Sequence, residues 1–292
     1  MSGKRGVSEK PTTAAGYAGA PIELVRATCL EVATVLGDLM DDLVVIGGLV
    51  PSLIIDQANL AEGVEAHVGT LDLDVGLSLA IFDEEHYQAI TERLRRAEFE
   101  PDVNDKGNQV KQRWRHRDHT RVTVDFLIPP SFETDKGGKI RHLENDFAAI
   151  IAPGLELAFR DFETININAT TLRGERANRD VRVSGAGAYV VLKALSFRNR
   201  GENKDAYDLY YVIRNYGDGV EDVAARFRLL LPNRECEEAL NVLREDFADP
   251  DAVGVRRAVA FLRGEGETDD ALQAEVMGFI GTFIDLVSEE DR

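Results

Sequence analysis

Two aspartates separated by one leucine are the first residues in this chain whose spacing suggests chemistry. Asp72 and Asp74 lie in HVGTLDLDVGLSLAIF (residues 67–82), which alternates like a β-strand and so would place both carboxylates on one face. Such a pair repels and loses hydration unless a cation lies beside it. Mg²⁺ binds one or two carboxylates and fills its other positions with water and phosphate oxygens. The pair therefore indicates a metal site, and an exposed strand face is the alternative.

A third aspartate interrupts an apolar run. Asp125 lies between Val124 and Phe126 in RVTVDFLIPP (residues 121–130), which we expect to form a hairpin with QVKQRWRH (residues 109–116). A charge is unusual in a strand of this kind. From a neighbouring strand its carboxylate could join the Asp-x-Asp pair, which predicts a three-carboxylate site for Mg²⁺, with Mn²⁺ as a substitute.

A glycine pair precedes these aspartates. Gly47 and Gly48 join the apolar stretch DLVVI to LVPSLIIDQ, which is predicted to be a short helix that starts near Pro51. Glycine lets the backbone approach an anion, and the start of a helix offers free N–H groups. The pair thus predicts contact with the phosphates of a nucleoside triphosphate, or only a tight turn. The segment 56–69 that follows is predicted to be an inserted loop at the mouth of a cleft.

The second half of the chain carries another charged motif. LKALSFRNRGENKDAYDLYYVI (residues 192–213) reads as two helices, with Asn203 as the expected cap of the second and Asp205 in its first turn, where the helix dipole favours a carboxylate. Asp208 falls one turn later, on the same face as Lys204. A Lys204–Asp208 surface ion pair is the alternative to a functional role.

The order of these motifs resembles that of the nucleotidyltransferase superfamily that includes DNA polymerase β: apolar residue, Gly-Gly, Asp-x-Asp, then a third Asp on a later strand. Residues 192–213 resemble the AbiEii-type nucleotidyltransferase toxins, which include the MenT proteins. The resemblance covers Gly47 to Ile213. It implies that three aspartates bind the metal and that five residues contact the nucleotide. It also implies that Lys193 neutralises charge that develops on the phosphates, that Asp125 assists in metal binding or activates the acceptor hydroxyl, and that Asp208 orients or activates the acceptor. The metal set is Asp72, Asp74 and Asp125, and the nucleotide set is Gly47, Gly48, Lys193, Lys204 and Asp205.

The activity implied by the resemblance is transfer of a nucleoside monophosphate from an NTP to an acceptor, with release of pyrophosphate. A tRNA 3′ end is the expected acceptor. The implied role is that of a toxin in a toxin–antitoxin or phage-defence system, with a cognate antitoxin protein as a further partner. Transfer to a protein hydroxyl or to a small molecule, and a catalytically silent module that binds nucleotide or a partner, are the alternatives. No motif names the base or the acceptor.

Charge limits where a nucleic acid could bind. With 52 acidic and 34 basic residues the formal net charge is −18, which opposes nonspecific attraction to nucleic acid and to membrane surfaces. The segment from Lys106 to Arg121 is the exception because it is basic and contains aromatic residues. Arg113, Arg115 and Arg117 are the candidate acceptor contacts. A charged hairpin edge that resists aggregation is the alternative.

The periodicity predicts an α+β fold. Residues 1–20 are predicted to be a flexible arm without catalytic residues, and residues 21–184 a nucleotidyltransferase domain with a mixed β-sheet flanked by helices. Residues 185–292 are predicted to be a helical bundle domain. Its expected helices cover residues 189–200, 203–217, 219–231, 234–247, 251–263 and 271–287.

Composition indicates a cytoplasmic protein. Cys29 and Cys236 lie far apart, without a metal-ligand spacing, which fits a reducing compartment. No apolar run is expected to reach the roughly 18 to 20 residues that a membrane-spanning helix requires, and no secretory signal is expected. Three of the histidines, His67, His86 and His142, show no metal spacing and are expected to be surface or loop residues.

Overall fold

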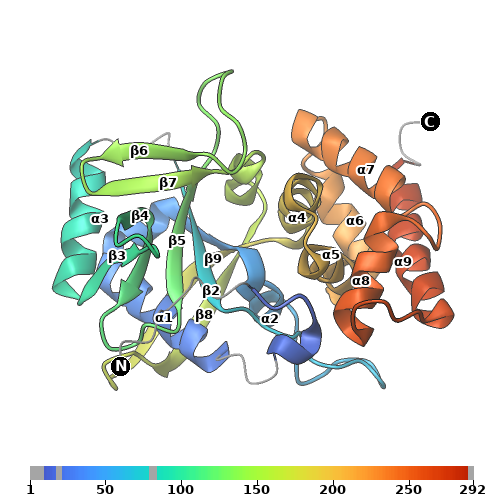
Figure 1. The fold of residues 1–292 in the computed structure, drawn as a ribbon, viewed down its shortest axis with the longest axis horizontal. Helices are drawn as coiled ribbons and strands as arrows, with labels where there is room; N and C mark the ends of the chain where they lie inside the picture. The colour runs from blue at the N-terminus through green and yellow to red at the C-terminus, as the bar shows by residue number, and fades with distance from the viewer. Residues whose placement is uncertain (1–9, 18–21, 79–83, 289–292) are drawn as a thin grey trace.

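The computed structural model describes residues 10–17, 22–78 and 84–288. A β-rich part and a helical part lie side by side (Figure 1). The strands are β1 (Leu43–Ile46), β2 (Asp72–Leu77), β3 (Phe99–Val103), β4 (Gln109–His116), β5 (Thr123–Ile128), β6 (Ile140–Glu144), β7 (Phe147–Ile151), β8 (Phe162–Thr170) and β9 (Arg176–Ser184). This confirms a mixed α+β fold with a mixed sheet, whereas the type of the β-rich domain stays a prediction.

The strands form one sheet in the order β3-β4-β5-β2-β1-β9-β8. Strand β7 pairs with the far end of β5, and β6 pairs with β7. The pairs β1/β9, β2/β5 and β5/β7 are parallel and the other pairs are antiparallel. The β2/β5 register sets Asp74 opposite Asp125, and this pairing positions the site.

Strand β2 has two chemically different faces. Leu73, Val75 and Leu77 are buried on one face, and the aspartates alternate with them on the other. Helix α1 (Ile22–Leu36) packs against β2, β8 and β9, and α3 (Glu84–Arg96) packs against β3, β6 and β7. The apolar face therefore belongs to the core, and the acidic face is left for the site.

The helical part begins two residues after the last strand. Its helices are α4 (Ala186–Arg200), α5 (Asn203–Asn215), α6 (Val220–Arg228), α7 (Arg234–Asp246), α8 (Val253–Arg263) and α9 (Asp270–Ser288). All six predicted helices are present, with ends that differ by a few residues. The short helix α2 (Pro51–Ile54) starts at the proline, as expected. Cys29 and Cys236 are buried free thiols.

One helix of the described residues, α9, is long and apolar enough by length and composition to cross a membrane. The expectation that no segment would meet this criterion is therefore wrong. The helix packs against α5, α6, α7 and α8, and Phe283 on it meets Phe227 of α6 at 5.3 Å between ring centroids. A core helix of a soluble protein passes the same test, so this single helix is weak evidence for a membrane span.

Several segments differ from the sequence-based prediction. The strand expected over residues 67–82 is regular only at β2, residues 67–71 approach it as an irregular segment, and residues 79–82 lie outside the described ranges. Strands β3, β6 and β7 were not predicted, because β3 contains Pro101 and β6 is polar, as edge strands often are. Of the predicted arm, residues 1–9 and 18–20 lie outside the described ranges. Residues 10–17 include the 3₁₀ helix η1 (Ala14–Tyr17) and the buried Tyr17.

Candidate functional site

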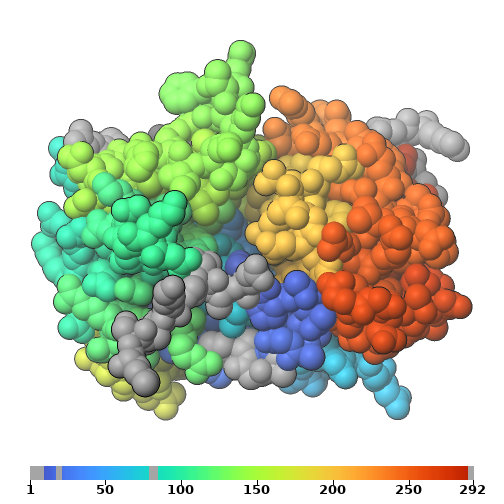
Figure 2. Space-filling model, in the orientation of Figure 1, coloured from blue at the N-terminus to red at the C-terminus, as the bar shows by residue number. Residues whose placement is uncertain are grey.

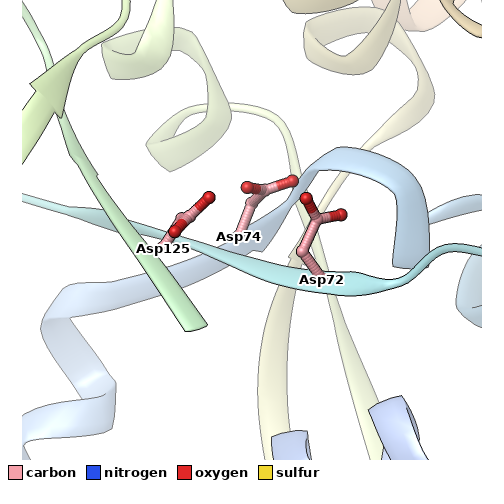
Figure 3. Close-up of side chains that lie close together, drawn as sticks. All are labelled: Asp72, Asp74 and Asp125. Carbon is pink, nitrogen blue, oxygen red and sulfur yellow. The ribbon is translucent and has the colours of Figure 1, made fainter. Parts of the chain in front are cut away.

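The three aspartates predicted from sequence come together at one point of the sheet. Asp72 and Asp74 from β2 and Asp125 from β5 project to the same side (Figure 3). One carboxylate oxygen from each lies within 4.8 Å of those of the others. Asp72 and Asp125 are buried, and Asp74 between them is half-buried. The arrangement offers three hard oxygen ligands to one divalent cation.

The glycine pair makes room for this cluster. Gly47 has a φ of +73°, and a Cβ built on it would lie 1.9 Å from Asp74 Oδ2. A Cβ on Gly48 would lie 2.6 Å from Thr70 Oγ1 and 3.6 Å from Lys204 Nζ. Any side chain at either position would therefore displace a group of the site. Gly48 also lines the cavity described below.

Each outer aspartate has a cationic partner. Lys10 Nζ lies 2.6 Å from Asp72 Oδ2, and Thr70 Oγ1 donates to Asp72 Oδ1 at 2.8 Å. The Arg113 guanidinium donates to both oxygens of Asp125 at 2.6 Å. Within the described ranges, the Asp74 carboxylate accepts no hydrogen bond and forms no ion pair. The central carboxylate is thus the member of the cluster without a direct cationic partner.

These surroundings separate the pKa values of the carboxyls. Burial, followed by the charges of Asp72 and Asp125, raises the pKa of Asp74 to about 7. Burial also raises the pKa of Asp125, against the opposing effect of Arg113. For Asp72, burial is outweighed by Lys10 and Thr70, so its pKa lies below the usual range. A bound divalent cation would favour the ionised form of all three carboxyls.

The raised pKa of Asp74 predicts that Asp74→Asn stabilises the metal-free protein more at pH 8 than at pH 5. A carboxyl whose folded pKa (about 7) exceeds the ordinary aspartate value of 3.8 contributes stability at low pH that is lost as the pH rises through 7. The substitution increases the free energy of unfolding, and this increase should be about 2 kcal/mol larger at pH 8 than at pH 5, allowing for the partial exposure of Asp74. Urea unfolding in EDTA measures it.

Wild type and Asp74→Asn must be compared at each pH, because His67 changes the stability of both with pH in the opposite direction to Asp74. Burial and Lys204 lower the pKa of His67 to about 4, so its contribution to stability increases as the pH rises toward 6.5. That contribution is shared by wild type and variant and cancels in the difference. An equal gain at both pH values would show that Asp74 is already ionised at pH 5.

The second motif forms a buried charge cluster on α4 and α5. Lys193 Nζ lies 3.0 Å from Asp205 Oδ1 and 2.7 Å from Asp208 Oδ2. Lys204 Nζ lies 2.8 Å from Asp208 Oδ1. The predicted Lys204–Asp208 pair exists, but both side chains are buried, so the interpretation as a surface pair is wrong. Arg200, which was not predicted, donates to both oxygens of Asp205 at 2.6 and 2.8 Å.

Mutual compensation sets the ionisation of this cluster. Lys193 and Lys204 outweigh burial and hold the pKa of Asp208 well below its usual value. Burial alone would lower the pKa of Lys193, but the charge of Asp208 outweighs burial and the pKa is raised. At Lys204 burial prevails and the pKa is lowered, with Lys193 adding to the effect. Asp208 is therefore the carboxylate that balances two buried ammonium groups.

His67 belongs to this cluster: it lies in a loop, which the prediction allowed, but its side chain is buried and not on the surface. Its Nε2 lies 2.8 Å from Asp208 Oδ1, and the Gly69 N–H donates to its Nδ1 at 3.1 Å. Because Nδ1 is an acceptor, the neutral ring must carry its proton on Nε2 and donate it to Asp208. The ring packs against Tyr207 and Tyr211 of α5, at 5.4 and 4.9 Å between centroids. The predicted inserted loop thus ends against α5.

The helix cap was also predicted incorrectly. Glu202 occupies the cap position of α5 and makes no capping hydrogen bond with its side chain. Asn203 is buried and its amide donates to the Thr12 carbonyl at 3.0 Å and to Glu265 at 2.8 Å. Asn203 therefore ties the N-terminal segment to the helical part instead of capping its own helix.

A cavity of about 730 Å³ joins the two clusters. On the face shown in Figure 2, the surface is hollowed between the β-rich part and helix α4. The three aspartates reach it from β2 and β5, and Lys193, Lys204 and Asp205 reach it from α4 and α5. The lining also includes Lys10, Tyr17, Arg113 and Arg200. An anionic ligand that carries a divalent cation could therefore meet acidic and basic groups in the same space.

The arginines of the predicted acceptor patch have partners within the chain. Arg113 is bound to Asp125, as described above. Arg115 lies 3.1 Å from Asp102 and 3.5 Å from Glu100, and Arg117 lies 3.4 Å from Glu100. Of the three, only Arg113 lines the cavity. Acidic side chains of β3 therefore engage Arg115 and Arg117. The alternative of a charged edge strand is wrong for β4, which lies between β3 and β5 in the sheet.

Lys10, Thr70, His67 and Arg200 are the site residues that sequence reasoning missed. Thr70 precedes the Asp-x-Asp pair and Arg200 ends α4, so proximity in sequence could have suggested both. His67 and Lys10 are brought in by contacts over 141 and 62 positions, and nothing local marks them.

No protein-family profile and no curated protein matches this chain. Among solved structures, it is similar to the crystal structure of JHP933 from Helicobacter pylori, with 12% sequence identity and a TM-score of 0.37 over 95% of this chain and 94% of that chain. A similarity this remote assigns neither a family nor an activity.

Proposed function

We propose that the protein is a Mg²⁺-dependent nucleotidyltransferase that transfers a nucleoside monophosphate from an NTP to an acceptor hydroxyl. The observation that carries the proposal is the convergence of Asp72, Asp74 and Asp125 on one point of a cavity that Lys193, Lys204 and Arg200 also line. Carboxylates in this number and spacing suit a divalent cation that holds phosphates. The order of motifs along the chain supports the same class of enzyme.

The carboxylates fit the metal on chemical grounds. They offer only oxygen ligands, and the central one has no direct cationic partner within the described ranges, with its pKa raised to about 7 by burial and by its neighbours. When bound, Mg²⁺ or Mn²⁺ would neutralise charge that develops on the phosphates and lower the pKa of an attacking hydroxyl. Asp72, Asp74 and Asp125 would hold it.

The chain's own cations complete the proposed nucleotide site. Lys193, Lys204 and Arg200 line the cavity together with the aspartates, where they would attract the triphosphate and stabilise the departing pyrophosphate. Their carboxylate partners Asp205 and Asp208 keep them charged and fix their positions. In this proposal Asp208 positions Lys193 and Lys204, with no direct contact to the acceptor required.

A tRNA 3′ end is the acceptor we propose, in the setting of a toxin with a cognate antitoxin. The test is incubation with each labelled NTP and total tRNA in Mg²⁺ or Mn²⁺. Label on tRNA with one NTP, lost in EDTA, is the expected result. Label on the protein itself or on a small molecule would show that the acceptor is a protein hydroxyl or a small molecule and not tRNA. No label with any NTP would contradict the proposal.

We expect Lys10 to lower the affinity of the site for a divalent cation. Its ammonium lies 2.6 Å from Asp72 and therefore competes with a cation for that carboxylate. Lys10→Met should raise the affinity for Mn²⁺, measured without nucleotide, by roughly 1.4- to 5-fold, the range for a partly exposed ion pair. Lys106→Met, an exposed lysine in the β3–β4 turn, is the control. Unchanged or weaker Mn²⁺ binding in Lys10→Met would refute the competition.

A further inference from the structure

The loop between β5 and β6 presents a rigid aromatic side chain on the cavity. Phe132 lines the cavity and is 67% exposed. Asp135 Oδ2 accepts the backbone N–H groups of Ser131 at 2.7 Å and of Phe132 at 3.0 Å. Asp135 also binds Arg141, whose guanidinium lies 5.0 Å from the Phe132 ring centroid. The backbone and one face of the ring are thus fixed, and most of the side chain remains open to solvent.

This loop reaches the helical part of the molecule. It rises from the end of β5 on the side facing α4 (Figure 1), and a Cβ on Gly138 would lie 3.3 Å from Asn199 Nδ2 of α4. Arg234, the first residue of α7, also lines the cavity and has no acidic partner within the described ranges. The cavity therefore extends from the aspartates to a wall that offers an aromatic surface and an available guanidinium.

We propose that Phe132 stacks a nucleobase of a single-stranded acceptor close to its 3′ end. The proposal rests on the proposed function, whose acceptor it places. Aromatic side chains bind single-stranded nucleic acid by stacking, because every base has a π-face. A ring held in advance loses little entropy on binding.

The length of β5 separates the ring from the aspartates, and in this proposal the acceptor supplies the base. From Asp125 to Ile128 the strand rises about 10 Å, at about 3.3 Å per residue, and Phe132 follows beyond the end of the strand. A nucleotide held by its phosphates at the aspartates would have to extend past β5 to reach the ring. A strand whose 3′ end lies at the aspartates can run along the cavity to it.

The charges on this wall indicate that stacking outweighs electrostatic attraction. Glu133, Glu235 and Glu238 line the cavity together with Arg198 and Arg234. Few uncompensated cations are available for phosphate contacts, so binding of a short strand should depend weakly on salt. A long basic groove for duplex nucleic acid would behave differently.

The test is binding of a short single-stranded RNA with 2-aminopurine next to its 3′ end, measured by fluorescence in Mg²⁺ without NTP. Phe132→Ala should weaken binding roughly 5- to 150-fold, the range that stacking of one base supplies. Phe132→Trp should retain binding, and Phe132→Leu should lose it. NTP affinity, measured separately, should stay unchanged in all three.

Phe162→Ala is the matched control, because Phe162 is also exposed and stacked on an arginine, Arg182 at 5.1 Å, but does not line the cavity. Wild-type RNA affinity in Phe132→Ala or in Phe132→Leu overturns the proposal, as does a loss confined to NTP binding. The assay needs no transfer, so repeating it in the Asp74→Asn background separates failure of this site from failure of the proposed enzyme.

Discussion

Asp74→Asn is expected to lower kcat/KM for nucleotide transfer by roughly 10²- to 10³-fold or more, the scale on which loss of preorganised charge stabilisation acts. Asp74 lies between Asp72 and Asp125 and has no other partner within the described ranges. Removing its charge should weaken the metal site while the fold, by the pH argument above, gains stability. Loss of activity with gain of stability is the signature of a functional carboxylate.

Metal-dependent stability and transfer activity, measured on wild type and variants, distinguish loss of the metal site from loss of the folded structure. Wild type should gain about 2.7 kcal/mol of unfolding free energy at a Mn²⁺ concentration one hundred times its Kd, and Asp74→Asn should gain far less. Glu62→Gln, an exposed carboxylate in the segment 56–69, should match wild type in both assays. Full transfer and an undiminished Mn²⁺ effect in Asp74→Asn would remove Asp74 from the metal site.

The parts of the site that sequence could predict depend on local geometry. Asp72 and Asp74 share a face because strand residues alternate, and Lys204 meets Asp208 because residues four apart are neighbours on a helix. The clustering of Asp125 with this pair was predicted from its place in a neighbouring strand. The register that sets it opposite Asp74 needed the structure, since a slip of one residue would have turned its carboxylate into the core.

What sequence could not predict depends on contacts between distant segments. Nothing near His67 indicates that Asp208 is its partner, and the neutral form of His67 follows from burial against α5. Lys10 lies in a segment without periodicity, so it was assigned to a flexible arm. Asn203 fits the pattern of a helix cap, but tertiary contacts with Thr12 and Glu265 use its amide instead. In each case the local pattern was compatible with several structures and packing selected one.

Asp208→Ala is expected to destabilise the protein by about 3–5 kcal/mol at pH 7, the cost of breaking a buried ion pair by removing one partner. The carboxylate is fully buried and contacts Lys193, Lys204 and His67. Without it, Lys193 keeps only Asp205, which Arg200 also binds, and Lys204 keeps no ion-pair partner within the described ranges. Urea unfolding at pH 7 measures the change, and Glu237→Ala on α7, an exposed carboxylate, should shift stability by less than about 0.5 kcal/mol.

A second substitution tests the cause of that loss. Because the cost comes from leaving Lys204 uncompensated, Lys204→Met in the Asp208→Ala background should recover part of the stability, although each single substitution is destabilising. The contribution of Asp208 should also disappear in acid, since its pKa lies well below the usual value and the stability it provides is lost as the pH falls through that pKa. Additive losses in the double variant would mean that Asp208 stabilises the fold through packing or through His67, and not by balancing the charge of the lysines.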